Sequence, residues 1–303
     1  MKKLLFISGA RPNIIKIAPL YKILNKNVKY ECKILHSNQH SNKSLYKNIY
    51  KNLGLPLPHF KIKKYSTNNR LDLLSYFIKS ISLKINVYKP NLIILFGDVD
   101  TTLAAGIVAR KSGIKTIHIE SGLRSKDFNA QEEINRRVVD HLSDINFATS
   151  PEAFKNLVKE GLKKKSHYVG NIIFDNYFNL KKKIISSKIL ENLNIFNNYI
   201  LVTMHRYQTI DNKKKLLKFI NTLNKLSKKN KILFSCHTRT KKNLIKYNLF
   251  NRTKKITTLL EPLTYTDFTN LLINSNLVID FLKNRKEKKF IYSGYGGVIL
   301  GSD

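Results

Sequence analysis

Short apolar runs alternate with helical patterns along the first half of this chain, and this alternation limits its possible folds more than any other feature. The strand-like runs occupy residues 3–8, 30–36, 92–96, 116–119 and 145–149. The helical patterns between them occupy roughly residues 13–25, 69–88, 101–111 and 132–142. Strands that alternate with helices form βαβ units, so the sequence predicts a parallel sheet with helices on both faces.

The alternation restarts in the second half of the chain. After the short stretch Tyr168–Asn171 and a lysine-rich helical segment, further strand-like runs occupy residues 199–204, 231–236, 255–259 and 277–280. Two such blocks predict an α/β protein with two doubly wound, Rossmann-like domains. We place the N-terminal domain at residues 1–175 and the C-terminal domain at residues 176–303.

Carboxylates follow two strand-like runs of the first block. The run Leu92–Phe96 ends at Gly97 and Asp98, and the run at 116–119 ends at Glu120. In open α/β sheets, ligands bind at the carboxyl ends of the strands. Asp98 and Glu120 are therefore candidates for chemistry.

Cationic and imidazole side chains follow other strand-like runs. Gly9 ends the first run and opens a helix that carries Arg11 and Lys16, a combination suited to binding an anion. His205 and His237 follow the runs at 199–204 and 231–236. A single such histidine is more often an ordinary loop residue. Taken together, we expect the strand-end residues to share one ligand-binding sheet edge: Arg11, Asp98, Glu120, His205 and His237.

The segment at residues 131–137 allows two interpretations. Glu132 and Arg136 are four residues apart, as are Glu133 and Arg137, which favours two surface ion pairs along one helix. Alternatively, the start of this helix brings a carboxylate to the two strand-end acids. Converging carboxylates would raise at least one pKa toward the range useful for acid–base chemistry. That arrangement suits the transfer of a proton to and from carbon.

The formal net charge of +35 is typical of proteins that bind nucleic acid or anionic membranes. The lysines are spread over the whole chain without an aromatic-basic motif, which disfavours a nucleic-acid partner and favours an anionic small substrate. The only cysteines, Cys32 and Cys236, argue against a disulfide framework and indicate a reducing, cytoplasmic compartment. No apolar run reaches the roughly 18 residues of a membrane span, so we expect no membrane association.

A set of ordered motifs resembles the non-hydrolysing UDP-N-acetylglucosamine 2-epimerases. The similarity runs from residue 3 to about residue 280. The motifs are Gly9–Asn13 with Lys16, Ala18 and Pro19; Gly97 and Asp98; His118–Ser125; Glu132–Arg136; Val169–Asn171; His205 and Arg206; and His237–Thr240. The resemblance implies a glycosyltransferase-B-like fold, a nucleotide sugar in the cleft between two Rossmann-type domains, and a homodimer.

The resemblance also implies a reaction. Family members are isomerases that interconvert UDP-N-acetylglucosamine and UDP-N-acetylmannosamine, for surface polysaccharide precursors, by eliminating and re-adding UDP through a 2-acetamidoglucal intermediate. Such chemistry calls for no metal and no nicotinamide cofactor. The resemblance assigns catalytic roles to Asp98, Glu120, Glu132 and His205, and substrate or UDP binding to Arg11, Lys16, Arg136, Arg206, His237 and Arg239.

The residues after position 280 depart from the family pattern. The family continues with a Ser/Thr-Asp-Ser-Gly-Gly loop and a helix that bears a glutamate, whereas here Asp280 is followed by Phe281–Lys289. We therefore expect an incomplete C-terminal domain, truncated or frameshifted after about residue 280.

Three functional hypotheses follow from these observations. The first is a UDP-N-acetylglucosamine 2-epimerase or an inactive truncated copy of one. The second keeps the family and changes the substrate to another UDP-2-acetamido sugar, or couples epimerisation to hydrolysis. The third is a non-catalytic nucleotide-binding protein or a basic nucleic-acid-binding protein, which only the net charge supports.

Overall fold

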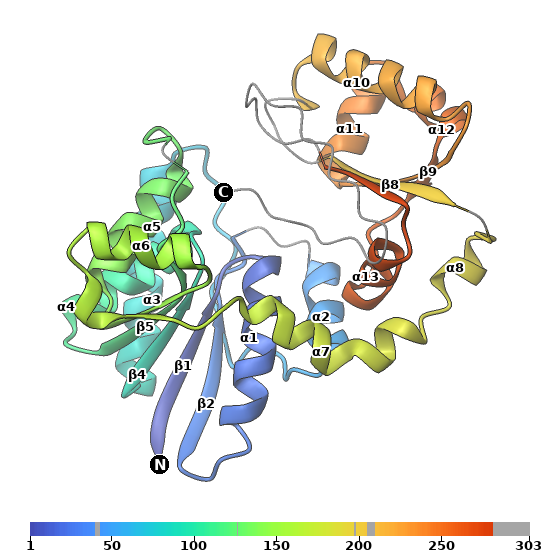
Figure 1. The fold of residues 1–303 in the computed structure, drawn as a ribbon. Helices are drawn as coiled ribbons and strands as arrows, with labels where there is room; N and C mark the ends of the chain where they lie inside the picture. Colours follow the sequence, from blue (N-terminus) through green and yellow to red (C-terminus); the bar gives the residue numbers. More distant parts are fainter. Residues whose placement is uncertain (40–42, 126, 197, 205–209, 281–303) are drawn as a thin grey trace. The chain divides into compact units, whose positions relative to one another are not determined.

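The computed structural model describes residues 1–39, 43–125, 127–196, 198–204 and 210–280. The chain divides into two compact units, with the boundary between Leu180 and Lys181 (Figure 1). The expected truncation or frameshift concerns residues 281–303, which lie outside the described residues.

The first unit contains a seven-stranded sheet in which every pair of neighbouring strands is parallel. The strands lie in the order β3 (Phe60–Lys61), β2 (Tyr30–His36), β1 (Lys2–Ser8), β4 (Leu92–Phe96), β5 (Lys115–Ser121), β6 (Ile145–Ala148) and β7 (Ser166–Tyr168). The strand order reverses between β1 and β4. In a doubly wound sheet this switch point opens a crevice at the carboxyl ends of the strands.

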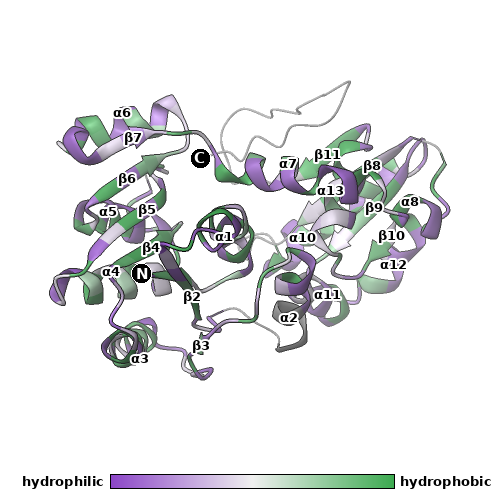
Figure 2. Cartoon of the chain, turned by 90° about the horizontal axis from the view of Figure 1, so that it is seen from below, coloured by the Kyte–Doolittle hydropathy of each residue, from purple (hydrophilic) through white to green (hydrophobic). Residues whose placement is uncertain are grey.

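Helices cover both faces of this sheet. On one face α3 (Arg70–Tyr88), α4 (Asp100–Lys111) and α5 (Gln131–Leu142) pack side by side, and α1 (Arg11–Leu24) and α2 (Lys43–Asn52) lie on the other (Figures 1 and 2). Seen nearly along their axes in Figure 2, α1 and α3 carry both hydrophobic and hydrophilic residues, as helices that cover a sheet with one face do. The unit also contains α6 (Pro151–Lys159), the 3-10 turn at Lys163–Lys165 and the first part of α7 (Ile172–Ile185).

The central strands are buried on both faces. Ile93 and Leu95 of β4 join the core formed with α3 and α4. Phe96 points the other way and stacks against Phe6 of β1, which in turn meets the ring of Tyr21 in α1 edge-on. Successive side chains of a strand point to opposite faces, which explains why the run is apolar throughout.

The second unit contains a smaller parallel sheet. Its described strands lie in the order β10 (Thr258–Leu260), β9 (Lys231–Cys236), β8 (Tyr199–Met204) and β11 (Leu277–Asp280). Val202 packs with α10 (Lys213–Leu226) on one face, and Leu201 packs on the other face in a cluster that includes α13 (Tyr265–Ile273). The unit also contains α8 (Ile189–Asn192), α11 (Thr238–Lys246) and α12 (Phe250–Ile256).

The predicted α/β architecture with parallel sheets is confirmed. One predicted strand, at residues 255–259, was misplaced, because α12 extends to Ile256 and the strand occupies only Thr258–Leu260. The helical patterns also left out α2 and α6, and the two-residue strand β3 was too short to leave a sequence signal. None of the described helices is long and apolar enough to cross a bilayer.

Candidate functional site

The turn after β4 carries Asp98. It begins with Gly97, whose φ of 63° lies in the left-handed region that glycine adopts readily. Asn13 at the start of α1 donates a hydrogen bond to the carbonyl of Phe96 at 2.8 Å, and Asn135 of α5 donates one to the carbonyl of Asp98 at 2.8 Å. Side chains of two helices therefore hold the turn from both sides.

Glu120 is the residue that bulges out at the end of β5. The ladder to β6 pairs Ile119 with Phe147 and then Ser121 with Ala148, so Glu120 has no partner in it. Glu120 also has a φ of 70°, a left-handed conformation that is strained for a residue with a side chain. A bulge with such a strained residue redirects one side chain of the strand. Here that side chain is the carboxylate.

Lys16 of α1 meets the Glu120 carboxylate. The Lys16 ammonium forms an ion pair with Glu120 Oε2 and is largely buried. Burial lowers the pKa of Lys16 to about 8, against the opposing effect of the negative charge on Asp98. Lys16 is therefore a cation at neutral pH that sits near its titration range.

Arg136 of α5 pairs with the second strand-end acid. Its Nη2 lies 2.5 Å from Asp98 Oδ2. A Cβ atom placed on Gly97 would lie 3.2 Å from Glu120 Oε2 and 3.4 Å from Lys16 Nζ. The Lys16–Glu120 pair thus lies against Gly97. The next residue, Asp98, forms the pair with Arg136, so the site holds two cations and two carboxylates.

Arg11 is the first residue of α1, at the carboxyl edge of the same sheet. Burial lowers the pKa of its guanidinium. The structure therefore brings predicted site residues to one edge of the larger sheet: Arg11, Lys16, Asp98, Glu120 and Arg136.

The two neighbouring glutamates of α5 have different environments. Glu132 is exposed, and none of the hydrogen bonds or ion pairs found among the described residues involves it. Glu133 is fully buried and accepts hydrogen bonds from the Ser125 backbone N–H and from Arg137, at 2.7 and 2.8 Å. Of the two expected i,i+4 ion pairs, only Glu133–Arg137 is found, because Arg136 turns to Asp98 instead.

The remaining predicted site residues belong to the second unit. His237 caps the N-terminus of α11, where its side chain accepts a hydrogen bond from the Arg239 backbone N–H at 3.3 Å. Arg239 forms an exposed ion pair with Asp211. His205 and Arg206 lie outside the described residues. The expectation of one shared sheet edge was wrong for His237, which follows β9 of the smaller sheet.

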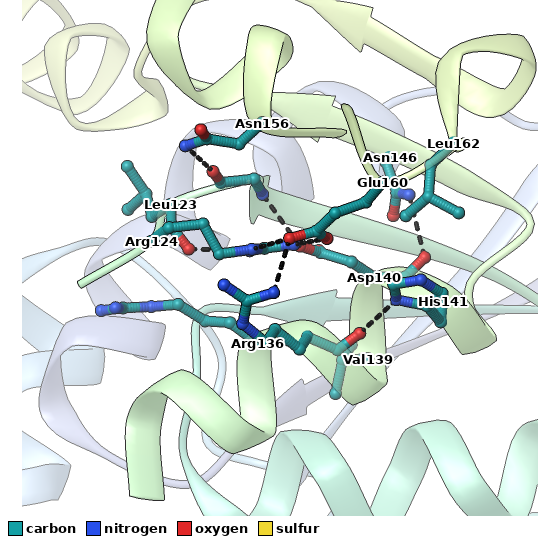
Figure 3. A network of polar contacts seen from close by, with 12 residues as sticks. Leu123, Arg124, Arg136, Val139, Asp140, His141, Asn146, Asn156, Glu160 and Leu162 are labelled. Carbon is teal, nitrogen blue, oxygen red and sulfur yellow. Dashed lines mark hydrogen bonds and ion pairs between the residues drawn. The ribbon is translucent and has the colours of Figure 1, made fainter. Parts of the chain in front are cut away.

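A buried charged network behind this edge escaped the sequence interpretation. Arg124 Nη2 lies 2.8 Å from Asp140 and 2.5 Å from Glu160 (Figure 3), and Asp140 lies 2.6 Å from the ring of His118. His118 and Asp140 are both fully buried. The sequence signal for this network was His118, an ionisable residue inside the strand-like run at residues 116–119. A buried ionisable group needs a partner.

The network keeps its acids ionised. Burial alone would raise the pKa of Asp140, but the hydrogen bond and charge of His118 and the nearby Arg124 lower it. Arg124 likewise lowers the pKa of Glu160. Although burial opposes it, hydrogen bonding to Glu160 raises the pKa of Arg124. These groups are fixed charges at neutral pH.

Known proteins resemble this chain in sequence. Residues 22–280 match the family described as UDP-N-acetylglucosamine 2-epimerase. The UDP-N-acetylglucosamine 2-epimerase of Methanocaldococcus jannaschii is 36% identical over 292 residues, which cover 91% of this chain and 78% of the relative. A UDP-N-acetylglucosamine 2-epimerase homolog of Methanococcus maripaludis is 34% identical over 240 residues, 78% of this chain and 66% of the relative.

A solved structure shows the same fold. The crystal structure of the Methanocaldococcus jannaschii UDP-GlcNAc 2-epimerase in complex with UDP-GlcNAc and UDP superposes with a TM-score of 0.83 at 34% identity, over 91% of this chain and 78% of that one. The parallel α/β units are thus of the glycosyltransferase-B-like kind. The matched residues, identities and fold show that the chain belongs to the UDP-N-acetylglucosamine 2-epimerase family.

Proposed function

We propose that this protein interconverts UDP-N-acetylglucosamine and UDP-N-acetylmannosamine by eliminating UDP and adding it back through a 2-acetamidoglucal intermediate. The observation that carries the proposal is the pair of carboxylates, Asp98 and Glu120, each matched with a cation at one edge of the larger sheet. The family membership and the UDP-GlcNAc bound in the Methanocaldococcus jannaschii structure support it.

The site offers the groups that such a reaction needs. Removal of the C2 proton requires a base, and its return to the opposite face requires an acid on that face. Asp98 and Glu120 supply two carboxylates from neighbouring strands, and Glu132 is a third candidate whose side chain is exposed at the start of α5.

The cations serve the departing diphosphate. Cleavage of the bond between C1 and oxygen leaves negative charge on UDP, and fixed positive groups stabilise it. Lys16, Arg136 and Arg11 lie at the same edge as the acids. Lys16 and Arg136 also hold Glu120 and Asp98, so substrate phosphate would compete for them and release the carboxylates for proton transfer.

We assign the acid–base residues to the N-terminal domain, residues 1–175, and UDP binding largely to the C-terminal domain, with Arg206, His237 and Arg239 as UDP ligands and His205 as a catalytic residue. The family resemblance supports these assignments and a homodimer. A cytoplasmic location fits the two cysteines, neither of which forms a disulfide.

The test is incubation of the full chain with UDP-N-acetylglucosamine in D2O, followed by proton NMR. The expected result is deuterium at C2 together with UDP-N-acetylmannosamine. Asp98→Asn should abolish the exchange, whereas Asp72→Asn, which changes an exposed carboxylate in the first turn of α3, should leave it unchanged.

Other outcomes distinguish the alternatives. Accumulation of free UDP and free sugar would point to a hydrolysing epimerase, and exchange only with another UDP-2-acetamido sugar would change the substrate. Absence of exchange with folded wild-type protein would reject an active enzyme.

A further inference from the structure

His118 lies within β5, two residues before Glu120, and is fully buried. Its Nδ1 lies 2.6 Å from Asp140 Oδ1, and its Nε2 lies 2.9 Å from the carbonyl oxygen of Gly97. Both ring nitrogens are therefore engaged by the protein. His118 is not available to a substrate.

The partners determine the direction of the two hydrogen bonds of the ring. The Gly97 carbonyl only accepts hydrogen bonds, so Nε2 carries a proton. The other oxygen of Asp140 accepts from the Gly122 backbone N–H at 3.0 Å and pairs with Arg124 at 2.8 Å, which keeps Asp140 a carboxylate. Nδ1 lies 2.6 Å from this carboxylate, so that hydrogen bond runs from His118 to Asp140.

This buried pair connects the two turns that carry the acids. His118 holds the Gly97 carbonyl, and Gly97 directly precedes Asp98. Asp140 holds the N–H of Gly122, two residues after Glu120. One hydrogen-bonded chain therefore runs from the β4 turn through His118 and Asp140 to the β5 bulge.

Arg124 connects this series of hydrogen bonds to neighbouring side chains. Its guanidinium reaches both Asp140 and Glu160, and the side chain of Asn156 donates to the carbonyl of Gly122 at 3.0 Å (Figure 3). Gly122 is thus held through both its N–H and its carbonyl. The β5 bulge is fixed by side chains of α5 and α6.

Stability alone does not account for such a pair. Apolar residues of similar volume often replace a buried ion pair with no loss of stability, or with a gain. Directional hydrogen bonds fix geometry, which apolar packing does less well. A misplacement of about 1 Å at reacting groups lowers rates by about 100-fold.

We propose that His118 and Asp140 are positioning residues that set the spacing between the Asp98 turn and the Glu120 bulge. The effect on catalysis rests on the proposed epimerase function, whereas the effect on the two turns does not. The pair touches no substrate and acts only through the backbone of Gly97 and Gly122.

Two substitutions of His118 each remove one of its two hydrogen bonds. The amide nitrogen of Gln occupies the place of Nε2, and that of Asn occupies the place of Nδ1. His118→Gln therefore keeps the bond to Gly97 and loses the bond to Asp140, while His118→Asn does the reverse. Each should lower kcat for epimerisation by about 100-fold and leave KM unchanged, as expected when geometry rather than binding is lost.

Hydrogen exchange followed by mass spectrometry provides a readout that needs no activity. His118→Asn should speed backbone exchange in peptides that cover Gly97 and Asp98, and His118→Gln in peptides that cover Glu120–Leu123. Ile81→Ala, a fully buried core position of α3, is the control. It should lower thermal stability without selective exchange at either turn and without a selective fall in kcat.

The outcomes test the positioning role of His118 and Asp140 separately from the proposed epimerase function. Wild-type protein without C2 exchange would reject the epimerase, and the exchange measurement would still test the positioning role. If both His118 variants change exchange only as Ile81→Ala does, the positioning role is rejected. Wild-type kcat in His118→Asn and His118→Gln, measured on an active enzyme, would reject it as well.

Discussion

At the scale of single residues, Lys16 is the group through which pH acts on this site. Its ammonium is buried in contact with Glu120, and burial lowers its pKa from 10.5 to about 8. Between these values the unfolded chain holds a proton that the folded chain lacks, so the free energy of unfolding rises with pH across that window. The cation that we propose as a phosphate ligand, however, is lost as pH passes about 8.

We therefore expect kcat/KM for UDP-N-acetylglucosamine to fall above about pH 8, the pKa of Lys16, because kcat/KM reports the ionisation of the free enzyme. Lys16→Gln should lower kcat/KM by about 10- to 100-fold at neutral pH, the effect of losing a charge-assisted hydrogen bond, and should remove this pH dependence. Steady-state kinetics from about pH 6.5 to about pH 9.5 measure both. A wild-type profile that stays flat to about pH 9 would contradict the assignment.

Glu132 and Glu133 show how far sequence reasoning reaches at this scale. Strand ends identify Asp98 and Glu120, because the alternation of strands and helices locates the carboxyl edge of a sheet. Which face of a helix is buried depends on tertiary packing, and the sequence Gln-Glu-Glu offers two adjacent acids. The buried one is Glu133, while the family resemblance assigns catalysis to Glu132.

Substitution of the two acids separates these roles. Glu133→Gln should lower the free energy of unfolding by about 1–3 kcal/mol, because Arg137 and the Ser125 N–H lose a buried carboxylate. Glu132→Gln should leave stability unchanged and lower kcat. Denaturant unfolding and the D2O exchange assay measure the two effects. A stable Glu133→Gln protein with no activity would instead make Glu133 the catalytic acid.

At the scale of elements, Gly122 joins the β5 bulge to α6. Its φ is 81°, and a Cβ atom there would lie 2.2 Å from the carbonyl oxygen of Ala153. The sequence indicates a turn at this glycine, but the approach of α6 becomes visible only in the folded structure. The misplaced strand at residues 255–259 has a related cause, since packing of α12 decides where the helix stops.

Alanine at two glycines with similar φ distinguishes strain from overlap. Gly113 has a φ of 66°, and no atom lies within 4 Å of the place that a Cβ atom would take, so Gly113→Ala should lower stability by about 1–2 kcal/mol from backbone strain alone. Gly122→Ala should lower it by a further 1–3 kcal/mol or so, roughly the usual range for overpacking. Thermal unfolding compares the two. Equal losses of stability in the two variants would mean that α6 shifts to accommodate the added methyl group.

At the scale of the whole molecule, the net charge of +35 sets up a long-range field. The charge gave no information about the fold, because lysines occur throughout both units. It does favour encounter with an anionic nucleotide sugar. The paired cations of the site are a local part of this field.

We expect kcat/KM to fall by about tenfold as ionic strength rises from about 0.01 M to about 1 M. The reason is that the Debye length shrinks from about 30 Å to about 3 Å over this range. The value of kcat should change little, since screening acts on encounter. Kinetics over a salt series, at constant pH, measure this. A kcat/KM independent of salt would show that the surface charge plays no part in substrate capture.

The bulge at Glu120 has a consequence for protein engineering. Glu120 is itself the residue without a partner in the ladder to β6, so the bulge places the carboxylate, and in a regular ladder the same side chain would take an ordinary position of the strand. A transplant of this acid pair into another parallel sheet therefore cannot consist of two point substitutions. It has to carry the inserted residue, Gly122 and a neighbouring helix that leaves room for both.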